Sequence, residues 1–339
     1  MTKLHAYRFV VAAAASAGLA ATFLLPGAGA ARTAAAIPGI VDVDTLLGDQ
    51  NAAAAGTGIV LTSNGEILTN NHVIRGETKV RVTDLDNDKT YTGRVVGYSV
   101  SKDVAVIQLQ NASGLQVAPI GDSSSARVGD AVNTYGNAEG AGGAPGASGK
   151  IVGLGKSVTA NGDGTSETLT GMIETNSPLQ PGDSGGPMVN AAGQVIGMDT
   201  AAGTNFSFGG ASSTRGFAIP INYARSLAAK IVAGQSSSTI HIGPTAFMGV
   251  GLAPSQGYFD QSSPGLTIAN VVSGSPSAKA GLAIYDVITK FDGKAVSSQT
   301  KLTSLILSKA PGDTVMITFQ DESGQTHSAS VTLASGPPQ

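Results

Sequence analysis

The chain has 339 residues, which is long enough for two domains, and its composition of 41% hydrophobic and 13% charged residues is that of a globular protein. The formal net charge of −3 gives no electrostatic reason to expect nucleic acid as a partner. The absence of cysteine excludes disulfides, thiol catalysis and Cys-ligated zinc. We expect no cofactor and no metal site.

Residues 1–30 have the pattern of an export signal. Lys3 and Arg8 precede an uncharged apolar run from Phe9 to Leu25, and Ala28-Gly29-Ala30 fits an A-x-A cleavage site. The alternative is an uncleaved anchor, since a run of about 17 residues is near the lower limit for a membrane span. In either case we expect a secreted or cell-envelope (periplasmic) protein, with membrane contact only if this segment is retained.

Between residues 31 and 225 short alternating or apolar runs are separated by Gly, Asn, Asp and Ser, as in turn-spaced strands. No long helical period interrupts them, so we predict a mainly β domain, a barrel or a sandwich. Such runs are Val41–Val43, Gly58–Leu61, Lys79–Val82, Val104–Ile107, Lys150–Val152 and Gln194–Ile196.

A helix and a linker are predicted over residues 226–244. Asn222 is the expected N-cap of a helix from Tyr223 to Val232, and Gly234 is the expected stop. Residues 245–336 are then predicted to form a separate small α+β domain. Its strands are expected near 247–252, 266–272, 286–291 and 314–319, and its helix near 298–308, before Pro311-Gly312.

The segment Pro181-Gly182-Asp183-Ser184-Gly185-Gly186-Pro187 places one serine among small residues. Glycines adopt dihedrals closed to other residues, so successive N–H groups can converge on one point. A nucleophile beside converging N–H donors is what acyl transfer to a carbonyl requires. The motif alone could be an ordinary turn, so the interpretation depends on a base and an acid elsewhere.

Histidine counting identifies the candidate base. Of four histidines, His5 lies in the leader, His241 in the interdomain linker and His327 in a polar turn of the second domain. Only His72, just after the strand Glu66–Leu68, shares a domain with Ser184. Asp103 opens the apolar run that ends at Leu109; a buried carboxylate there needs a partner, and the His72 N–H would supply one. A structural histidine and a strand-capping aspartate are the alternatives.

Four motifs in order resemble those of HtrA (DegP-like) proteases of the secreted actinobacterial kind. They are Thr69-Asn70-Asn71-His72-Val73-Ile74, Asp103-Val104-Ala105-Val106, Gly182-Asp183-Ser184-Gly185-Gly186-Pro187 and Gly216-Phe217-Ala218-Ile219-Pro220. The resemblance covers nearly everything after residue 40. It implies a trypsin-like double β-barrel with the active site between the barrels.

The same resemblance implies residue roles. Ser184 would attack, His72 would shuttle the proton and Asp103 would orient His72, while the N–H groups of Gly182 and Ser184, with Asp183 between them, would form the oxyanion hole. Thr200 falls where the related fold has a hydroxyl close to the catalytic Asp. The substrate pocket would be uncharged and would favour a small or medium apolar P1 residue; its walls would include Pro178, Leu179, Thr200, Ala201, Ala202, Phe217 and Ala218.

Two departures from the family pattern stand out. Asp183 replaces the Asn that many members carry before the serine, which invites activation by a new N-terminus at Ile40-Val41; we expect that stretch to be a first strand instead. The aromatic residues that often hold family trimers are also missing, because no aromatic residue occurs between residue 30 and Tyr91. An oligomer is therefore possible, but a trimer is in doubt.

The second region resembles a PDZ domain in its HtrA arrangement. Ser273–Leu282, Asp286-Val287-Ile288 and Asp292-Gly293 carry the resemblance, together with Phe247-Met248-Gly249-Val250, the implied carboxylate-binding loop, whose apolar side chains would line the groove. Such a domain binds an extended peptide as an added strand. Polypeptide substrates and peptide C-termini are therefore the expected partners, and a packing module without a ligand is the alternative.

Two apparent binding motifs are set aside. Asp84–Asp88 imitates a calcium loop but has Lys89 at the turn glycine and Val95 at the bidentate Glu, so a polar hairpin tip is expected. Residues 136–150 are glycine-rich, but they lack the earlier glycine of a phosphate loop and are expected to be a surface loop.

The sequence therefore predicts an exported, ATP-independent serine endopeptidase that cleaves unfolded or damaged proteins. The alternative is a peptide-binding chaperone with latent or secondary proteolysis; an esterase on the same residues is a further one.

Overall fold

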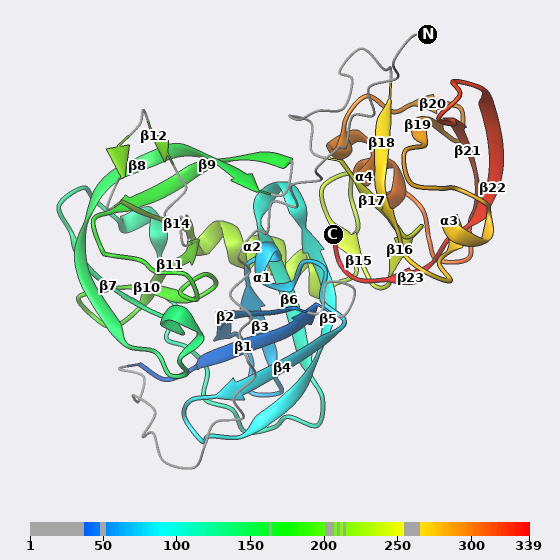
Figure 1. Cartoon of the computed structure of the whole chain (residues 1–339). Coiled ribbons are helices and arrows are strands. Elements are labelled where there is room, and N and C mark those ends of the chain that lie inside the picture. Colours follow the sequence, from blue (N-terminus) through cyan, green and yellow to red (C-terminus); the bar gives the residue numbers. More distant parts are fainter. Residues whose placement is uncertain are drawn as a thin grey trace, which may run out of the picture. The chain divides into compact units, whose positions relative to one another are not determined.

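The computed structural model describes residues 37–47, 52–162, 165–200, 207–208, 211–212, 215–253 and 265–339 (Figure 1). The expected leader at 1–30 and the pocket residues Ala201 and Ala202 lie outside this part. The predicted mainly β class is confirmed, because two barrels and a third sheet make up most of the described residues. No helix within the described residues is both long and apolar enough to cross a membrane.

The first barrel closes in the strand order β5-β4-β1-β2-β3-β6, with β6 pairing back onto β5. Alternation produces it: in β4, Val80 and Val82 are buried while Arg81 points to solvent. Ile40-Val41 opens β1, as predicted. Its strands are β1 (Ile40–Leu47), β2 (Ala52–Val60), β3 (Glu66–Thr69), β4 (Lys79–Asp84), β5 (Thr90–Ser99) and β6 (Val104–Leu109).

The second barrel is closed in the order β10-β11-β14-β9-β8-β7. All six residues of β11 are buried, including the polar residues Asp199 and Thr200 at its end. The prediction of a surface loop over residues 136–150 is partly wrong, because β8 already begins at Gly146. The strands are β7 (Ala131–Tyr135), β8 (Gly146–Gly162), β9 (Thr165–Thr175), β10 (Pro187–Asn190), β11 (Val195–Thr200) and β14 (Gly216–Pro220); β12 (Ser207–Phe208) pairs only with β13 (Ala211–Ser212).

Helix α2 (Ile221–Val232) packs on both barrels, against β6 of the first and β11 of the second. It begins two residues earlier than predicted, with Pro220 at the N-cap. Asn222 is not the cap, because its Nδ2 donates to Asp122 Oδ1 at 2.6 Å. The other helices of this region are single turns: α1 (Asn71–Ile74) and the 3-10 turns η2 (Val100–Lys102), η3 (Ser123–Ser125) and η4 (Ala138–Gly140).

The second domain contains a sheet in the order β17-β18-β19-β21-β22 around its own core of fifteen buried residues. The strand predicted at 247–252 is broken by Gly249, whose φ is +82°. The predicted helix is confirmed as α4 (Gln299–Leu307), capped by Ser298. The remaining elements are β15 (His241–Ile242), which pairs with β5, then β16 (Thr245–Phe247), β17 (Val250–Leu252), β18 (Leu266–Val271), α3 (Pro276–Lys279), β19 (Val287–Phe291), β20 (Lys294–Ala295), β21 (Thr314–Gln320), β22 (Thr326–Thr332) and β23 (Ala334–Gly336).

Candidate active site

His72 and Asp103 are in direct contact. His72 lies on α1, directly after β3, and its Nδ1 is 3.0 Å from Asp103 Oδ1 and 2.9 Å from Oδ2. The backbone N–H of His72 also donates to Oδ1, at 3.0 Å. The imidazole is 40% exposed, whereas the carboxylate is only 7% exposed. One nitrogen of the ring is thus held by a buried acid while the ring itself faces solvent.

Two further groups hold Asp103. Thr200 Oγ1 donates to Oδ2 at 3.0 Å, from the end of β11 in the other barrel. Asn70 Nδ2 donates to the backbone carbonyl of Asp103 at 2.9 Å. Asp103 itself has φ +51°, a left-handed conformation that Asp and Asn adopt more readily than most residues. The carboxylate is therefore buried but hydrogen-bonded.

The turn that carries Ser184 joins β9 to β10 and is held by its carbonyl groups. Pro181 O accepts from Glu139 N at 2.6 Å, and Gly182 O accepts from Thr57 Oγ1 at 2.7 Å. In a trans peptide the C=O and the N–H point in opposite directions, so the first bond turns the Gly182 N–H away from Glu139. Within the described part of the chain this N–H makes no hydrogen bond.

The peptide between Asp183 and Ser184 is fixed in the same way. Asp183 O accepts from Gly186 N at 2.9 Å, so the Ser184 N–H points away from Gly186. The N–H of Asp183 donates to Gln180 O at 3.1 Å and is thus used within the turn. The N–H groups of Gly182 and Ser184 point away from the two donors, Glu139 N and Gly186 N, that bond the carbonyls of the same peptides.

Glycine is required at two positions of this turn. A Cβ on Gly182 would lie 2.0 Å from Asn137 O, and one on Gly185 would lie 2.1 Å from Thr57 O. Their φ angles, +100° and +85°, also exclude most other residues. The glycines around Ser184 therefore indicate that other backbone segments approach this turn closely, rather than that the turn is flexible.

Ser184 lies close to the segment that carries His72. A Cβ on Gly56 in β2 would be 2.7 Å from Val73 Cγ1 and 3.3 Å from Ser184 O. Because Val73 follows His72, one glycine separates the serine turn from α1. Gly182-x-Ser184-x-Gly186 also has the spacing of a hydrolase nucleophile elbow, but strand β10 follows the turn, whereas an elbow leads into a helix.

Two buried acids, Asp183 in this turn and Asp199 in β11, have no ion pair with any described residue. Burial raises the pKa of Asp199 well above its ordinary value, and the charge of Asp183 raises it further. Both carboxyl oxygens of Asp199 lack a hydrogen-bond partner among the described residues. Burial also raises the pKa of Asp183, opposed by a bond from Gln180 N. Burial of Asp199 thus disfavours its charged form relative to a carboxyl group in water.

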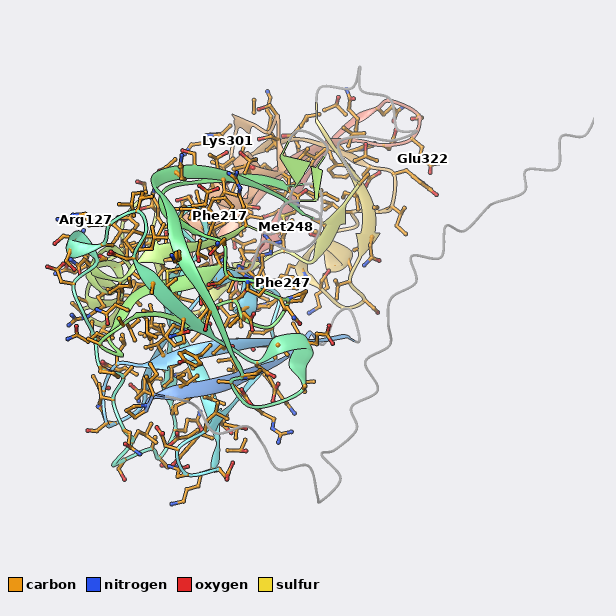
Figure 2. The ribbon with its side chains drawn as sticks, turned by 90° about the vertical axis from the view of Figure 1, so that its left-hand side faces the viewer. Arg127, Phe217, Phe247, Met248, Lys301 and Glu322 are labelled. Carbon is orange, nitrogen blue, oxygen red and sulfur yellow. The ribbon has the colours of Figure 1, made fainter. Side chains whose placement is uncertain are left out.

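The predicted pocket residues do not all face one space. Pro178 is exposed and Leu179 half-buried, with Leu179 Cδ1 only 2.6 Å from where a Cβ on Gly216 would lie. Phe217, labelled in Figure 2, is 3% exposed and Ala218 is fully buried, and both belong to hydrophobic cores. Among the described wall residues, Pro178 and Leu179 thus remain at least partly accessible, with Leu179 lying against Gly216.

The loop predicted to receive a peptide carboxylate runs from the end of β16 to the start of β17, and Figure 2 labels its residues Phe247 and Met248. Met248 O accepts from Ser277 N at 2.9 Å, and Gly249 O accepts from Val272 N at 3.0 Å. The N–H groups of Gly249 and Val250 therefore point away from those two donors. Met248 is 2% exposed and packs in the domain core, whereas Phe247 and Val250 are half-buried.

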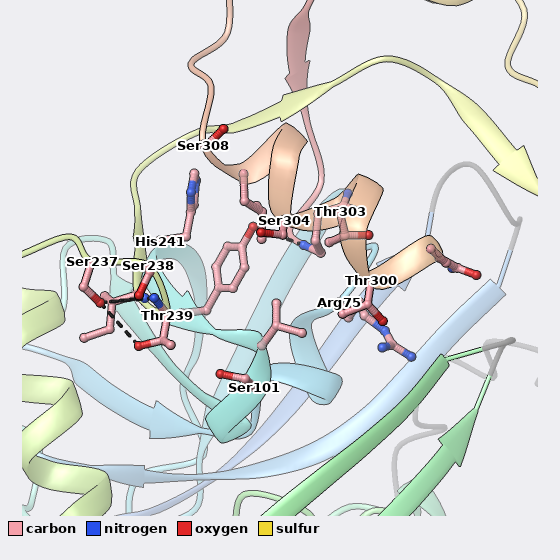
Figure 3. Close-up of a pocket in the computed structure, with 16 residues that line it drawn as sticks. Arg75, Ser101, Ser237, Ser238, Thr239, His241, Thr300, Thr303, Ser304 and Ser308 are labelled. Atoms are coloured by element: carbon pink, nitrogen blue, oxygen red, sulfur yellow. Dashed lines mark hydrogen bonds between the residues drawn. The ribbon is translucent and has the colours of Figure 1, made fainter. Parts of the chain in front are cut away.

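A separate cavity of about 630 Å³ does not include the His72–Asp103 pair (Figure 3). It lies among β5, the residues before β15 and one face of α4. Its lining is rich in hydroxyl groups and includes Arg75, Tyr98, His241, Thr303 and Ser304. Among the described residues no group of three or more His, Cys, Asp or Glu could hold a metal ion.

One residue of the site was missed by the sequence interpretation. Thr57 contacts the serine turn through both its hydroxyl and its backbone N–H. The signal that could have drawn attention to it is the pair of glycines on either side, Gly56 and Gly58, inside a strand where glycine indicates close approach of another backbone.

Comparison with known proteins agrees with this architecture. Residues 56–198 match the trypsin-like peptidase domain, and residues 246–333 match the PDZ domain. The chain is 34% identical over 337 residues to the serine protease PepD of Mycobacterium tuberculosis, covering 95% of this chain and 69% of PepD. It is 33% identical over 265 residues to the periplasmic pH-dependent serine endoprotease DegQ of Escherichia coli, covering 77% of this chain and 55% of DegQ. It thus spans between 55% and 69% of the length of these curated relatives.

Among solved structures, the HtrA-type protease AlgW with a tripeptide has a TM-score of 0.51 and 27% identity, covering 89% of this chain and 95% of that chain. Two β-barrels followed by a PDZ domain define a trypsin-like serine protease. The chain belongs to the HtrA family of serine proteases, as the four ordered motifs predicted.

Proposed function

We propose that this protein is an exported, ATP-independent serine endopeptidase that hydrolyses unfolded or damaged polypeptides, with Ser184 as nucleophile, His72 as general base and Asp103 as its orienter. The observation that carries the proposal is the contact of His72 Nδ1 with both oxygens of Asp103, at 3.0 and 2.9 Å. Because Nδ1 is engaged, Nε2 is the nitrogen that can exchange a proton with a serine hydroxyl. Asp103 stabilises the imidazolium that forms.

The reaction follows from these roles. Ser184 Oγ attacks the scissile carbonyl carbon and its proton passes to His72, which later protonates the leaving amine. Water then hydrolyses the acyl-enzyme by the same route. The N–H groups of Gly182 and Ser184 stabilise the oxyanion. This role is supported by the hydrogen bonds to the carbonyls of Pro181 and Asp183, which orient the two peptides that carry these N–H groups.

For specificity we propose a small or medium apolar P1 residue. The support is the packing of Leu179 over Gly216 and the lack of any charge among the predicted wall residues. A basic P1 side chain would need an acid there, and none of the predicted wall residues is acidic.

The PDZ domain is proposed to bind extended peptides through the Phe247–Val250 loop, with the peptide carboxylate received by backbone N–H groups. The support is the orientation of the Gly249 and Val250 peptides and the tripeptide bound to AlgW. Export is supported by the leader pattern and by the periplasmic location in the name of DegQ.

The test is a labelling and cleavage experiment on the secreted protein. A fluorophosphonate probe should label wild type and not Ser184→Ala, and Ser184→Ala should not hydrolyse casein. Asp103→Asn is a cleaner variant than Asp103→Ala, since Asn tolerates φ +51°, and it should remain folded while kcat falls about 10⁴-fold.

Failure of folded wild type to react with the probe would contradict the proposal. The Ser184→Ala protein also separates it from the chaperone alternative, which predicts that this variant still suppresses client aggregation and fully restores function in cells.

A further inference from the structure

Thr57 uses all of its polar groups around the active site. It lies in β2 of the first barrel and is fully buried. Its hydroxyl donates to Gly182 O at 2.7 Å and accepts from Asn137 N at 2.8 Å. Its backbone N–H donates to Ser184 O at 2.8 Å, and its carbonyl accepts from Thr69 Oγ1 at 2.7 Å.

These bonds connect the two barrels at the reacting groups. Gly182, Ser184 and Asn137 come from the second barrel and its loops, whereas Thr57 and Thr69 belong to adjacent strands of the first. Thr69 is three residues before His72. A single residue, through its hydroxyl and its backbone N–H, therefore bonds the two residues that carry the oxyanion-binding N–H groups and ties them to the strand that leads to the base.

The hydroxyl is chemically specific for this position. Only a group that donates and accepts at once can satisfy both Gly182 O and Asn137 N, and a hydroxyl does so with one proton and its lone pairs. Valine has nearly the same shape but would leave the carbonyl and the N–H without this partner. Serine would retain both bonds and lose only the methyl group.

We propose that Thr57 is a positioning residue for oxyanion stabilisation: its hydroxyl holds the Gly182 carbonyl and, together with the bond from Glu139 N to Pro181 O, fixes the residue whose N–H meets the developing negative charge. The inference rests on the proposed protease function. Gly182, with φ +100°, has no side chain to hold it, so its orientation depends on bonds to its carbonyl and to Pro181 O. A donor displaced by about 1 Å loses much of its effect in the transition state.

The alternative is that Thr57 is an ordinary buried threonine whose loss only lowers stability. The two roles differ in what they change. A structural role lowers the melting temperature and the active fraction, but leaves kcat per active site intact. A positioning role lowers kcat and the affinity for tetrahedral analogues, with little change in KM.

The experiment compares Thr57→Val, Thr57→Ser and Thr134→Val with wild type, each normalised by fluorophosphonate active-site titration. Thr134 is the matched control, because it is buried in β7 and its hydroxyl also donates to a carbonyl, that of Ala147 at 3.2 Å. We expect kcat of Thr57→Val to fall about 10- to 100-fold with KM within about threefold, and the Ki of a peptidyl boronate to rise by the same factor as kcat falls.

Thr57→Ser should restore kcat to within about threefold of wild type, and Thr134→Val should leave kcat unchanged. If Thr57→Val, normalised by active-site titration, has the wild-type kcat and boronate affinity, this inference is overturned while the proposed function stands. A Thr57→Ser variant whose kcat is as low as that of Thr57→Val would have the same consequence. Wild type that neither labels nor cleaves would overturn the proposed function, and this inference with it.

Discussion

The carboxyl group of Glu77 is half-buried, two residues after Arg75, the C-cap of helix α1. Burial raises the pKa of Glu77 from 4.5 to about 7. The folded state therefore holds this proton more tightly than the unfolded state. Its contribution to stability is complete below pH 4.5 and is lost as the pH rises through 7.

We predict that Glu77→Gln, which cannot ionise, becomes more stable relative to wild type as the pH rises. Urea midpoints measured at pH 4.5, 6 and 8 should show a difference that grows with pH, because only wild type must ionise a buried carboxyl. Glu322→Gln, at an exposed carboxyl, measures the effect of losing a surface charge. A Glu77→Gln difference that stays constant across this range would contradict the prediction.

Residues with chemistry of their own could be identified from the sequence, whereas residues that act through geometry could not. His72 was found by elimination among four histidines, and Asp103 by the cost of burying a charge at the start of an apolar run. Thr57 was not found, because its partners Gly182 and Asn137 are about 125 and 80 positions away along the chain. The left-handed backbone of Asp103 was equally invisible.

At the scale of elements, the same arrangement occurs at both proposed binding sites: a carbonyl that accepts a hydrogen bond turns the N–H of the same peptide away from that donor. In the serine turn the donors are Glu139 and Gly186, and in the PDZ loop they are Val272 and Ser277. Strand alternation predicted most elements, but it could not reveal such tertiary bonds. The strand expected at 247–252 is broken at Gly249, whose φ of +82° departs from strand geometry.

We predict that Gly249→Ala weakens binding of a peptide with a free C-terminus by at least about tenfold, equivalent to about 1.4 kcal/mol. Gly249 has φ +82°, and a Cβ there would lie 2.2 Å from Ser275 Cβ. The matched control is Gly274→Ala, with φ +70° but nothing within 4 Å of the added Cβ. Titration calorimetry with free and amidated peptides measures both, and equal losses in the two variants would exclude the clash as the cause.

At the scale of the molecule, Tyr98 joins residues that are far apart in the sequence. Its ring is fully buried in the first barrel, and its hydroxyl lies 2.9 Å from Thr245 Oγ1 and accepts from Gln339 N at 3.2 Å. Asn71 Nδ2 donates to Gln339 O at 3.0 Å, next to His72. The first residues of β16 and the segment after β23 are thus bonded to the barrel that carries the candidate base. None of these pairings follows a local pattern, so the sequence could not indicate them.

We predict that Tyr98→Phe loosens this connection at a cost of about 1 to 2 kcal/mol, because Thr245, 2% exposed, and Gln339 N lose a partner that water cannot easily replace. Hydrogen exchange should become faster in peptides covering 244–248 and 334–339, and the calorimetric melting temperature should fall. Tyr135→Phe is the control, since the Tyr135 hydroxyl makes no hydrogen bond with any described residue. Unchanged exchange in both peptides would show that the Tyr98 hydroxyl does not hold these segments. The connection would then consist of the bonds from Asn71 Nδ2 to Gln339 O and from Gly76 N to Pro338 O.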